Sequence, residues 1–236
     1  MPISASSITA WGDSTDASQY TSGSMSAAAG ELVLAYIVGR ATSSTATSVA
    51  LSGAGLTWVQ AASLQYNTIA APRYKCALFR AMSGSDTAAS AVSIVFNQTQ
   101  TGGIFSFVRF SGVDTGGVDG SSALVQSATA RGDLNVNPEV TLSAFASTDN
   151  ATYSAVSASP SGSAITQDTG FTEFHDVGSA DPGRIEAARL IGVDTTITSA
   201  LAGSGAWGAV GAEIRAAPAG GPAAALYTLA LSGAGV

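Results

Sequence analysis

The chain has 236 residues, which suits one large β domain or one domain with an appendage. Only 11 % of the residues are charged, well below the roughly 25 % of an ordinary soluble domain, and 46 % are hydrophobic. The net charge is −7 and Lys75 is the only lysine, so no basic patch exists to neutralise phosphates and we expect no nucleic-acid partner. No run approaches the roughly 18 apolar residues of a membrane span, which predicts no membrane insertion.

Runs of period-2 hydrophobicity predict strands along most of the chain. The first strong run, residues 31–40 (ELVLAYIVGR), is almost continuously apolar and predicts a central strand covered on both faces. Further strands are predicted at residues 56–59, 74–82, 92–97, 104–110, 140–145, 184–192 and 206–216. Residues 184–191 (RIEAARLI) could also form a short helix, but their β-branched residues and the stop at Gly192 favour a strand.

The fold predicted from this pattern is all-β. Clusters of Gly, Ser, Thr, Asn and Asp separate the runs at roughly the 8–12 residue spacing of sandwiches. We therefore expect an antiparallel β-sandwich of jelly-roll type, with about eight to ten strands over residues 1–217. Residues 172–177 (TEFHDV) are interpreted as a polar loop, and residues 52–55 as a glycine turn.

The C-terminal part, residues 218–236, departs from this pattern. Residues 217–222 (APAGGP) have the composition of a linker, and an uncharged, strand-forming tail follows. Tyr227, Leu229 and Leu231 lie on one side of that tail and are the predicted partner contact. The end of the tail, ALSGAGV, repeats ALSGAGL of residues 50–56, either as an echo of biased composition or as an added strand that docks on a sheet.

Candidate catalytic groups are few. His175 is the one imidazole, with Glu173 and Asp176 beside it, so it could serve as a base or bind a metal, but a structural site needs more ligands. Cys76, the single cysteine, excludes an internal disulfide and is expected to be a buried, inert thiol. Because no nucleophile elbow, zinc-protease motif or P-loop is present, we expect no enzyme, no cofactor and no metal.

Carboxylates occur as close pairs in the sequence: Asp13 with Asp16, Asp114 with Asp119, and Asp181 with Glu186. A glycosidase needs two such acids across a cleft, and an Asp-rich loop could also hold calcium. Aspartate before Gly, Ser or Thr is ordinary turn chemistry, because its side chain caps nearby backbone amides. We therefore expect Asp114 to stabilise a bend after a core strand.

Two further motifs invite a binding interpretation. Residues 131–133 (RGD) match an adhesion tripeptide, although a Gly-Asp turn also explains them. Exposed aromatic residues would suggest stacking on sugars, but Trp11, Trp58 and Trp207 each border an apolar run. Packing in or at the rim of the core is the expected role of all three.

The order and spacing of several segments resemble a known family. The segments are DSTDASQYTSGSMSAAAGELVLAYIV, LSGAGLTWV, RYKCALFRAMSG, FSFVRFSGVDTGGVDGSSALVQ and WGAVGAEIRAAP. Over residues 13–218 this succession resembles a β-sandwich family of tailed-phage structural proteins. The resemblance implies a non-enzymatic virion protein, such as a capsid decoration or a head or tail appendage, and it does not extend to the tail.

The resemblance also explains a conflict between the composition of the chain and its N-terminal sequence. Residues 1–16 contain neither a basic start nor an apolar stretch, so we expect no secretory signal, although the composition is that of an extracellular β-module. A virion protein is made in the host cytoplasm and released by lysis. The expected partners are a major capsid or tail protein and further copies of the chain. The alternatives are a carbohydrate-binding module or host adhesin, which would bind a surface glycan, and a glycoside hydrolase.

Overall fold

The computed structural model describes residues 2–42, 47–67, 73–159 and 164–218 of the chain. Tyr227, Leu229, Leu231 and the rest of the tail lie outside the described residues. Within those residues the chain forms sixteen strands and no helix, and every paired strand is antiparallel. The strands are β1 Ser4–Asp13, β2 Ala17–Thr21, β3 Leu32–Ala41, β4 Val49–Gly53, β5 Val59–Tyr66, β6 Arg73–Met82, β7 Val92–Gln100, β8 Gly102–Ser111, β9 Leu124–Asn135, β10 Glu139–Thr141, β11 Ala151–Ser159, β12 Ile165–Gln167, β13 Thr172–Gly178, β14 Arg184–Leu190, β15 Thr196–Leu201 and β16 Gly205–Ile214.

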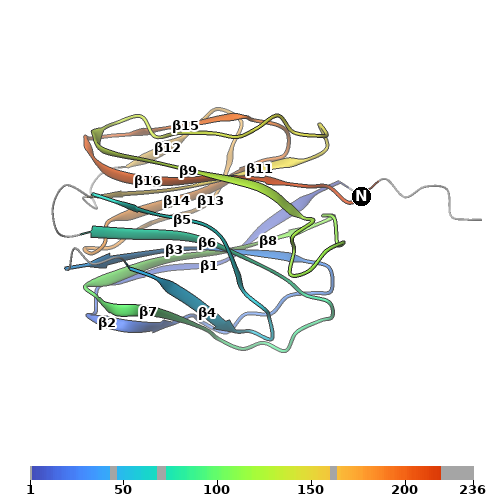
Figure 1. The fold of residues 1–236 in the computed structure, drawn as a ribbon, viewed down its shortest axis with the longest axis horizontal. Helices are drawn as coiled ribbons and strands as arrows, with labels where there is room; N and C mark the ends of the chain where they lie inside the picture. The colour runs from blue at the N-terminus through green and yellow to red at the C-terminus, as the bar shows by residue number, and fades with distance from the viewer. Residues whose placement is uncertain (1, 43–46, 68–72, 160–163, 219–236) are drawn as a thin grey trace, which may run out of the picture.

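The strands form four sheets stacked as layers (Figure 1). In the first half of the chain, a five-stranded sheet in the order β1-β8-β3-β6-β5 is covered on its outer side by the three-stranded sheet β2-β7-β4. In the second half, β13-β14-β11-β16-β9 is covered by β10-β15-β12. Counted from β9, the second half repeats the strand order of the first half in both of its sheets. The molecule therefore consists of two sandwiches of the same topology, stacked through their five-stranded sheets.

Three apolar cores lie between the four layers. The central core joins the two five-stranded sheets and contains the largest cluster of buried residues. Its first-half side has mostly bulky residues such as Tyr36 and Phe110, and its second-half side combines Tyr153 with several small residues such as Ala155 and Ala212. Large side chains on one sheet thus fill the space that small side chains leave on the other, which is how close packing is reached without voids.

Strands in the middle of the stack are buried on both faces, and their sequences explain why. The first eight residues of β3 are buried, as the continuous apolar run predicted. All ten residues of β16 are buried, and its Gly and Ala residues permit close approach of the neighbouring layers. In β8, Ile104 and Val108 face the central core while Phe105 and Phe107 face the outer core, as the alternation predicted.

Polar contacts fix how the two sandwiches sit on one another. The hydroxyl of Tyr36 donates to Ser157 Oγ at 3.1 Å, and the hydroxyls of Tyr74 and Ser159 lie 2.6 Å apart. At the edge of the same interface the guanidinium of Arg40 pairs with Asp181. Because buried polar groups are costly unless they are paired, these contacts favour one register of the stack.

The structure confirms an all-β, antiparallel, sandwich-like fold and corrects its details. Sixteen strands are present in place of eight to ten, because the short polar strands of the outer sheets lack a long apolar run. Residues 172–177 form strand β13 rather than a loop, and β10 is limited to Glu139–Thr141. Residues 56–58 precede β5 instead of forming a strand, whereas residues 184–190 are the predicted strand. Gly53, Ala54 and Gly55 all have positive φ, which confirms the turn at 52–55.

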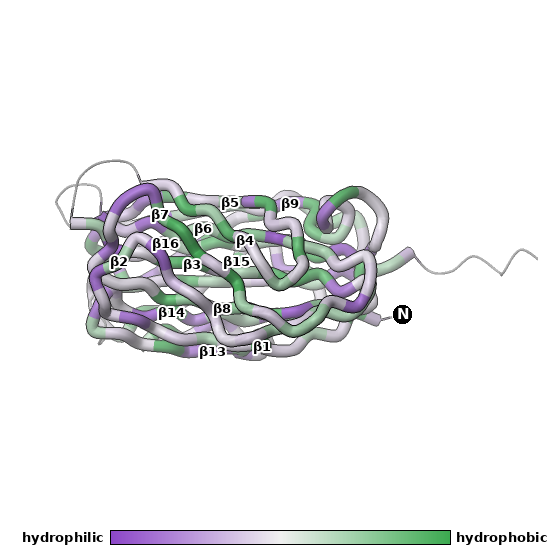
Figure 2. The backbone as a smooth tube through the Cα atoms, turned by 90° about the horizontal axis from the view of Figure 1, so that it is seen from below, coloured by the Kyte–Doolittle hydropathy of each residue, from purple (hydrophilic) through white to green (hydrophobic). Residues whose placement is uncertain are grey.

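The charge-poor composition is visible along the described backbone. Much of the backbone in Figure 2 has pale colours, which correspond to residues of intermediate hydropathy such as Ala, Ser, Gly and Thr. Among the described residues, no helix is long and apolar enough to cross a membrane.

Candidate functional site

His175 lies on β13 and faces the interface between the two sandwiches. Its Nδ1 is 2.9 Å from the hydroxyl oxygen of Ser106 on β8, and burial lowers the pKa of the imidazole below its usual value. A serine hydrogen-bonded to a neutral imidazole is the pairing that nucleophilic catalysis uses. Here Ser106 has no exposed surface, because it is sealed between the two five-stranded sheets. The pair is a polar contact between the two sandwiches.

The two acids next to His175 in the sequence do not join it. Successive residues of a strand point to opposite faces, so Asp176 lies on the other side of β13, where Arg184 holds it through two guanidinium nitrogens. Within the described ranges, no group of three or more His, Cys, Asp and Glu side chains is placed to hold a metal ion.

Glu186 is a buried acid that lies close to Asp181 in the sequence. The structure instead places it opposite Asp176 in the β13–β14 ladder, while Asp181 contacts Arg40 of the other sandwich. Glu186 is 3 % exposed, and its pKa is raised to about 7 by burial and by the nearby carboxylates of Glu173 and Asp176, against the opposing effect of Arg184. Two adjacent acids with different proton affinities are typical of glycosidases, but this one is covered and has no access to a sugar.

Asp114 and Asp119 lie in the loop between β8 and β9 and have separate roles. One carboxylate oxygen of Asp114 accepts from the Gly116 amide at 2.9 Å, and the other lies 3.7 Å from Arg215 Nη1. Asp114 therefore stabilises its own bend, as predicted. Asp13 behaves in the same way, because its carboxylate accepts from the Thr15 amide at 2.8 Å. These contacts are turn chemistry rather than paired catalytic acids.

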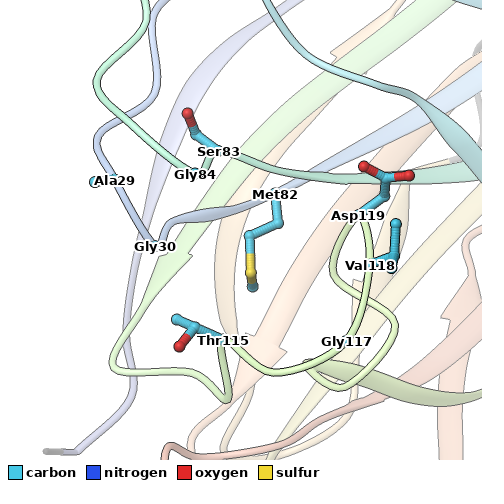
Figure 3. Close-up of a pocket in the computed structure, with 9 residues that line it drawn as sticks. All are labelled: Ala29, Gly30, Met82, Ser83, Gly84, Thr115, Gly117, Val118 and Asp119. Carbon is cyan, nitrogen blue, oxygen red and sulfur yellow. The ribbon is translucent and has the colours of Figure 1, made fainter.

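Asp119 borders a hollow of about 620 Å³ at one end of the first sandwich (Figure 3). One wall is the turn before β3, the other is the β8–β9 loop, and Met82 at the end of β6 lies between them. The lining residues are Ala29, Gly30, Met82, Ser83, Gly84, Thr115, Gly117, Val118 and Asp119. The volume falls within the roughly 300–1,000 Å³ of small-ligand sites.

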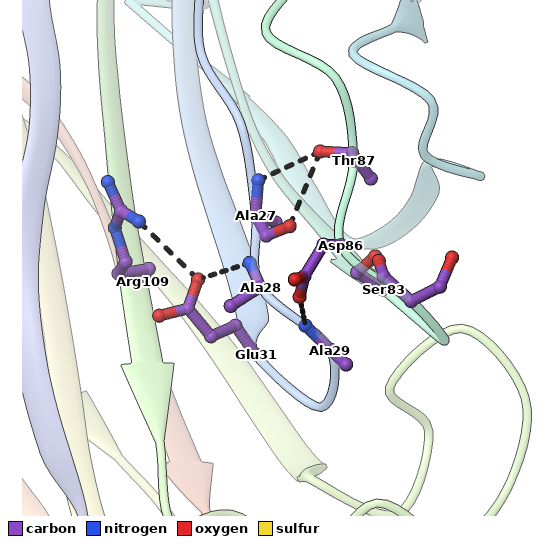
Figure 4. Close-up of polar contacts among 9 residues, drawn as sticks. Ala27, Ala28, Ala29, Glu31, Ser83, Asp86, Thr87 and Arg109 are labelled. Carbon is purple, nitrogen blue, oxygen red and sulfur yellow. Dashed lines mark hydrogen bonds and ion pairs between the residues drawn. The ribbon is translucent and has the colours of Figure 1, made fainter.

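Hydrogen bonds fix the turn that forms the first wall (Figure 4). The amide of Ala28 donates to Glu31 Oε2, which also lies 3.4 Å from Arg109 Nη1, and the amide of Ala29 donates to Asp86 Oδ1 at 2.9 Å. The hydroxyl of Thr87 accepts from the amide of Ala27 at 2.9 Å. This wall is therefore held in place by side chains from three different segments.

A second hollow, of about 450 Å³, lies over the outer sheet of the second sandwich. Its lining is almost entirely polar: Asn137, Glu139, Thr166, Gln167, Asp168, Thr169, Thr198, Ser199 and Ala200. Thr198 donates to Asp168 Oδ2 at 2.7 Å, and this bond together with the Thr169 amide lowers the pKa of that carboxyl. The lining offers many hydrogen-bonding groups and no aromatic side chain.

The remaining candidates from the sequence are structural. Trp11 stacks on Phe107 and Trp58 meets the same ring edge-on, both at 5.9 Å, so these two tryptophans pack at the rim of the outer core. Trp207 is buried in the outer core of the second sandwich. Cys76 is fully buried, and burial raises the pKa of its thiol to about 11, as expected of an inert cysteine.

The RGD tripeptide does not form the predicted turn. Residues 131–133 lie inside β9, where Arg131 and Gly132 pair with β16, and Arg131 Nη1 donates to the carbonyl of Gln65 in the other sandwich at 2.8 Å. The tripeptide is therefore part of an extended, anchored strand and is not presented on a protruding loop.

The geometry of the described residues defines an antiparallel, all-β protein with two stacked sandwiches and a surface hollow on each of them. No protein-family model, curated protein or solved structure that was compared matches the chain.

Proposed function

We propose that the chain is a non-enzymatic structural protein of a bacteriophage virion, belonging to the tailed-phage β-sandwich family that its sequence resembles. It binds the capsid lattice or the tail as a decoration or appendage, through a major capsid or tail protein and as a homo-oligomer. Each sandwich is a jelly roll in this proposal. The order β1-β8-β3-β6 opposite β2-β7-β4 supports it, because two interleaved Greek keys produce this alternation.

The observation that supports a scaffold role most strongly is the contact that His175 makes. The one imidazole of the chain is directed at a buried serine between the two sandwiches, where it joins layers. Asp13, Asp114 and Asp181 are likewise engaged by backbone amides or by arginines. Side chains capable of chemistry thus contribute to the fold, and the charge-poor surface suits contact with other subunits.

Binding to a repeating lattice also explains how weak contacts would suffice. Many copies on one particle, or an oligomer with several linked contacts, raise the effective concentration of each contact, so overall binding is far tighter than any single one. The protein is then found in the virion after synthesis in the host cytoplasm.

Co-purification with particles tests this proposal. Particles of the phage that encodes the chain are separated on a density gradient, washed with high salt and analysed for the protein. We expect it in the particle fraction at many copies per particle. Its absence from washed particles would overturn the proposal.

A matched truncation tests the predicted partner contact at Tyr227, Leu229 and Leu231. Removal of residues 219–236 is expected to release the protein from particles if the tail is the anchor, while the truncated protein keeps the thermal stability of the full chain. Unchanged incorporation of the truncated chain would rule out the tail as the anchor. The surface of the sandwiches would then be the remaining candidate for the contact with the particle.

The second candidate function is carbohydrate binding, as a module or host adhesin of a phage particle. The polar hollow over β10, β12 and β15 favours it, because its carboxylates, amides and hydroxyls match the hydroxyl groups of a sugar. A glycan array tests this directly. Binding that is lost in Asp168→Ala and retained in Asp86→Ala would establish it, and an array without signal would remove it.

A further inference from the structure

The hollow beside Asp119 combines an apolar floor with an available carboxylate. Met82 and the 73 % exposed Val118 supply apolar surface. Asp119 is half-buried, and among the described residues its carboxylate accepts no hydrogen bond, since Arg80 Nε donates to the backbone carbonyl of the same residue at 3.2 Å. A half-buried carboxylate without a partner attracts a cation that can also donate hydrogen bonds.

The other charged groups around the hollow are mostly neutralised. Glu31 pairs with Arg109, and Asp114 pairs with Arg215. Asp86, on the first wall, accepts one backbone amide and forms no ion pair within the described residues. Together with Asp119 it outweighs Arg80, so the hollow favours a positive ligand on a protein whose net charge is −7.

Both walls are fixed before any ligand arrives. Gly30, with φ of +76°, donates to the carbonyl of Ser83 at 2.8 Å, and a Cβ at this glycine would lie 3.3 Å from Thr115 on the opposite wall. On the second wall, the amide of Val118 donates to Ser121 Oγ at 3.1 Å. A preformed site avoids the entropic cost of ordering a loop on binding.

A lysine side chain matches this arrangement. Its four methylene groups can lie along apolar surface while the ammonium group reaches a carboxylate at the rim. The chain itself cannot easily supply that lysine, because Lys75 is its only one and already donates to Ser63 Oγ at 2.9 Å. The lysine must therefore come from a different protein rather than from a second copy.

We propose that this hollow is a docking site for a lysine side chain of a partner protein, with the alkyl chain against Met82 and Val118 and the ammonium group at Asp119. The site is independent of where in a particle, or on what other assembly, the chain functions. It would give the charge-poor surface one specific, salt-sensitive contact.

Methyl NMR can test the site with a defined probe. The chain has three methionines, so a methionine-methyl-labelled sample gives a simple spectrum in which Met82 reports on the hollow and the buried Met25 serves as internal reference. The probe is Nα-acetyl-lysine N-methylamide, and its Nε-acetylated form is the matched control with the same alkyl chain but no charge. We expect a saturable shift of the Met82 methyl with the charged probe and a several-fold weaker effect with the control.

Asp119→Asn is the decisive variant. Asp119 has φ of 51°, a conformation that asparagine tolerates well, so the charge is removed without new backbone strain. We expect the charged probe to bind about fivefold more weakly to this variant, and as well as before to Glu139→Gln in the other sandwich. An unmoved Met82 signal, equal binding of both probes, or wild-type binding by Asp119→Asn with an unchanged thermal transition would each overturn the proposal.

Discussion

Asp114 shows how a carboxylate that resembles a catalytic group can be a turn component. Replacing it with alanine removes the acceptor for the Gly116 amide and the partner of Arg215. We expect Asp114→Ala to lower the free energy of unfolding by about 1 kcal/mol, measured by thermal or denaturant unfolding, without loss of particle binding.

Asparagine at the same position separates the two contacts. Asp114→Asn keeps an acceptor for the Gly116 amide and loses only the partly exposed ion pair, so most of the stability should return. If Asp114→Ala were as stable as the wild type but abolished binding, the carboxylate would belong to a binding site instead.

Glu186 predicts a pH dependence of stability. Its pKa rises from 4.5 in the unfolded chain to about 7 in the fold, so the stabilising effect of the bound proton is complete below about pH 4.5 and is lost as the pH rises through about 7. The free energy of unfolding of the wild type should therefore fall by up to about 3 kcal/mol over this pH range, and Glu186→Gln should not show this fall. Denaturant unfolding at about pH 5 and about pH 8 measures it.

The exposed Glu139 supplies the control for that experiment. Glu139→Gln should leave the difference between the two pH values as it is in the wild type, because this side chain is exposed rather than buried. A Glu186→Gln protein with the same pH dependence as the wild type would show that this carboxyl ionises freely within the sheet.

At the scale of the element, β16 depends on residues without side chains. A Cβ at Gly208 would lie 2.6 Å from Tyr66 Cδ1 and 3.0 Å from Cys76 Sγ across the central core. We expect Gly208→Ala to destabilise the protein by about 1–3 kcal/mol through overpacking. Gly23→Ala is the matched control, because no atom lies within 4 Å of the added carbon, and equal stability of the two variants would contradict the packing described for β16.

Strands buried on both faces were the ones that the sequence could predict. Residues 31–40 and 104–110 have apolar runs or clear alternation, and they became β3 and β8. Strand β13 was missed because its inward residues are Phe174, His175 and Val177 around a bulge, which interrupts the period of two. Strand β9 was also not predicted, because its sequence is largely polar and its extended form depends on pairing with β16.

Only part of the candidate site could be predicted from the sequence. Asp114 was correctly interpreted as a turn residue, because its neighbours Gly116 and Gly117 are local turn signals. The Ser106–His175 contact and the pairing of Asp176 with Glu186 depend on which strands become neighbours. Local pattern does not encode those neighbours, so both were missed.

At the scale of the whole molecule, the repeated strand order is the main organising feature. Each half has one five-stranded and one three-stranded sheet in the same order, and the five-stranded sheets bury each other. The outer core of the second half contains seven buried residues in the described part of the chain, against fifteen in the first half. The second half therefore depends on the central interface more than the first half does.

Separate expression of the halves tests this dependence. We expect residues 124–218 alone to lack a cooperative unfolding transition, because their inner sheet would expose a face that Tyr36, Phe110 and their neighbours normally cover. The full chain should unfold in one transition, measured by calorimetry. Two separate transitions that match two independently folded halves would contradict the shared core.

The central claim is that this stacked pair of sandwiches is a building component of a virus particle. If the proposal is right, an electron cryo-microscopy map of intact particles of a phage that carries this gene is the most direct test. We expect repeated copies of a four-layered, strand-only density on the head or tail, with the end that contains Asp119 against a neighbouring protein. Complete particles without such density would contradict the proposal, and so would a purified chain that hydrolyses a polysaccharide.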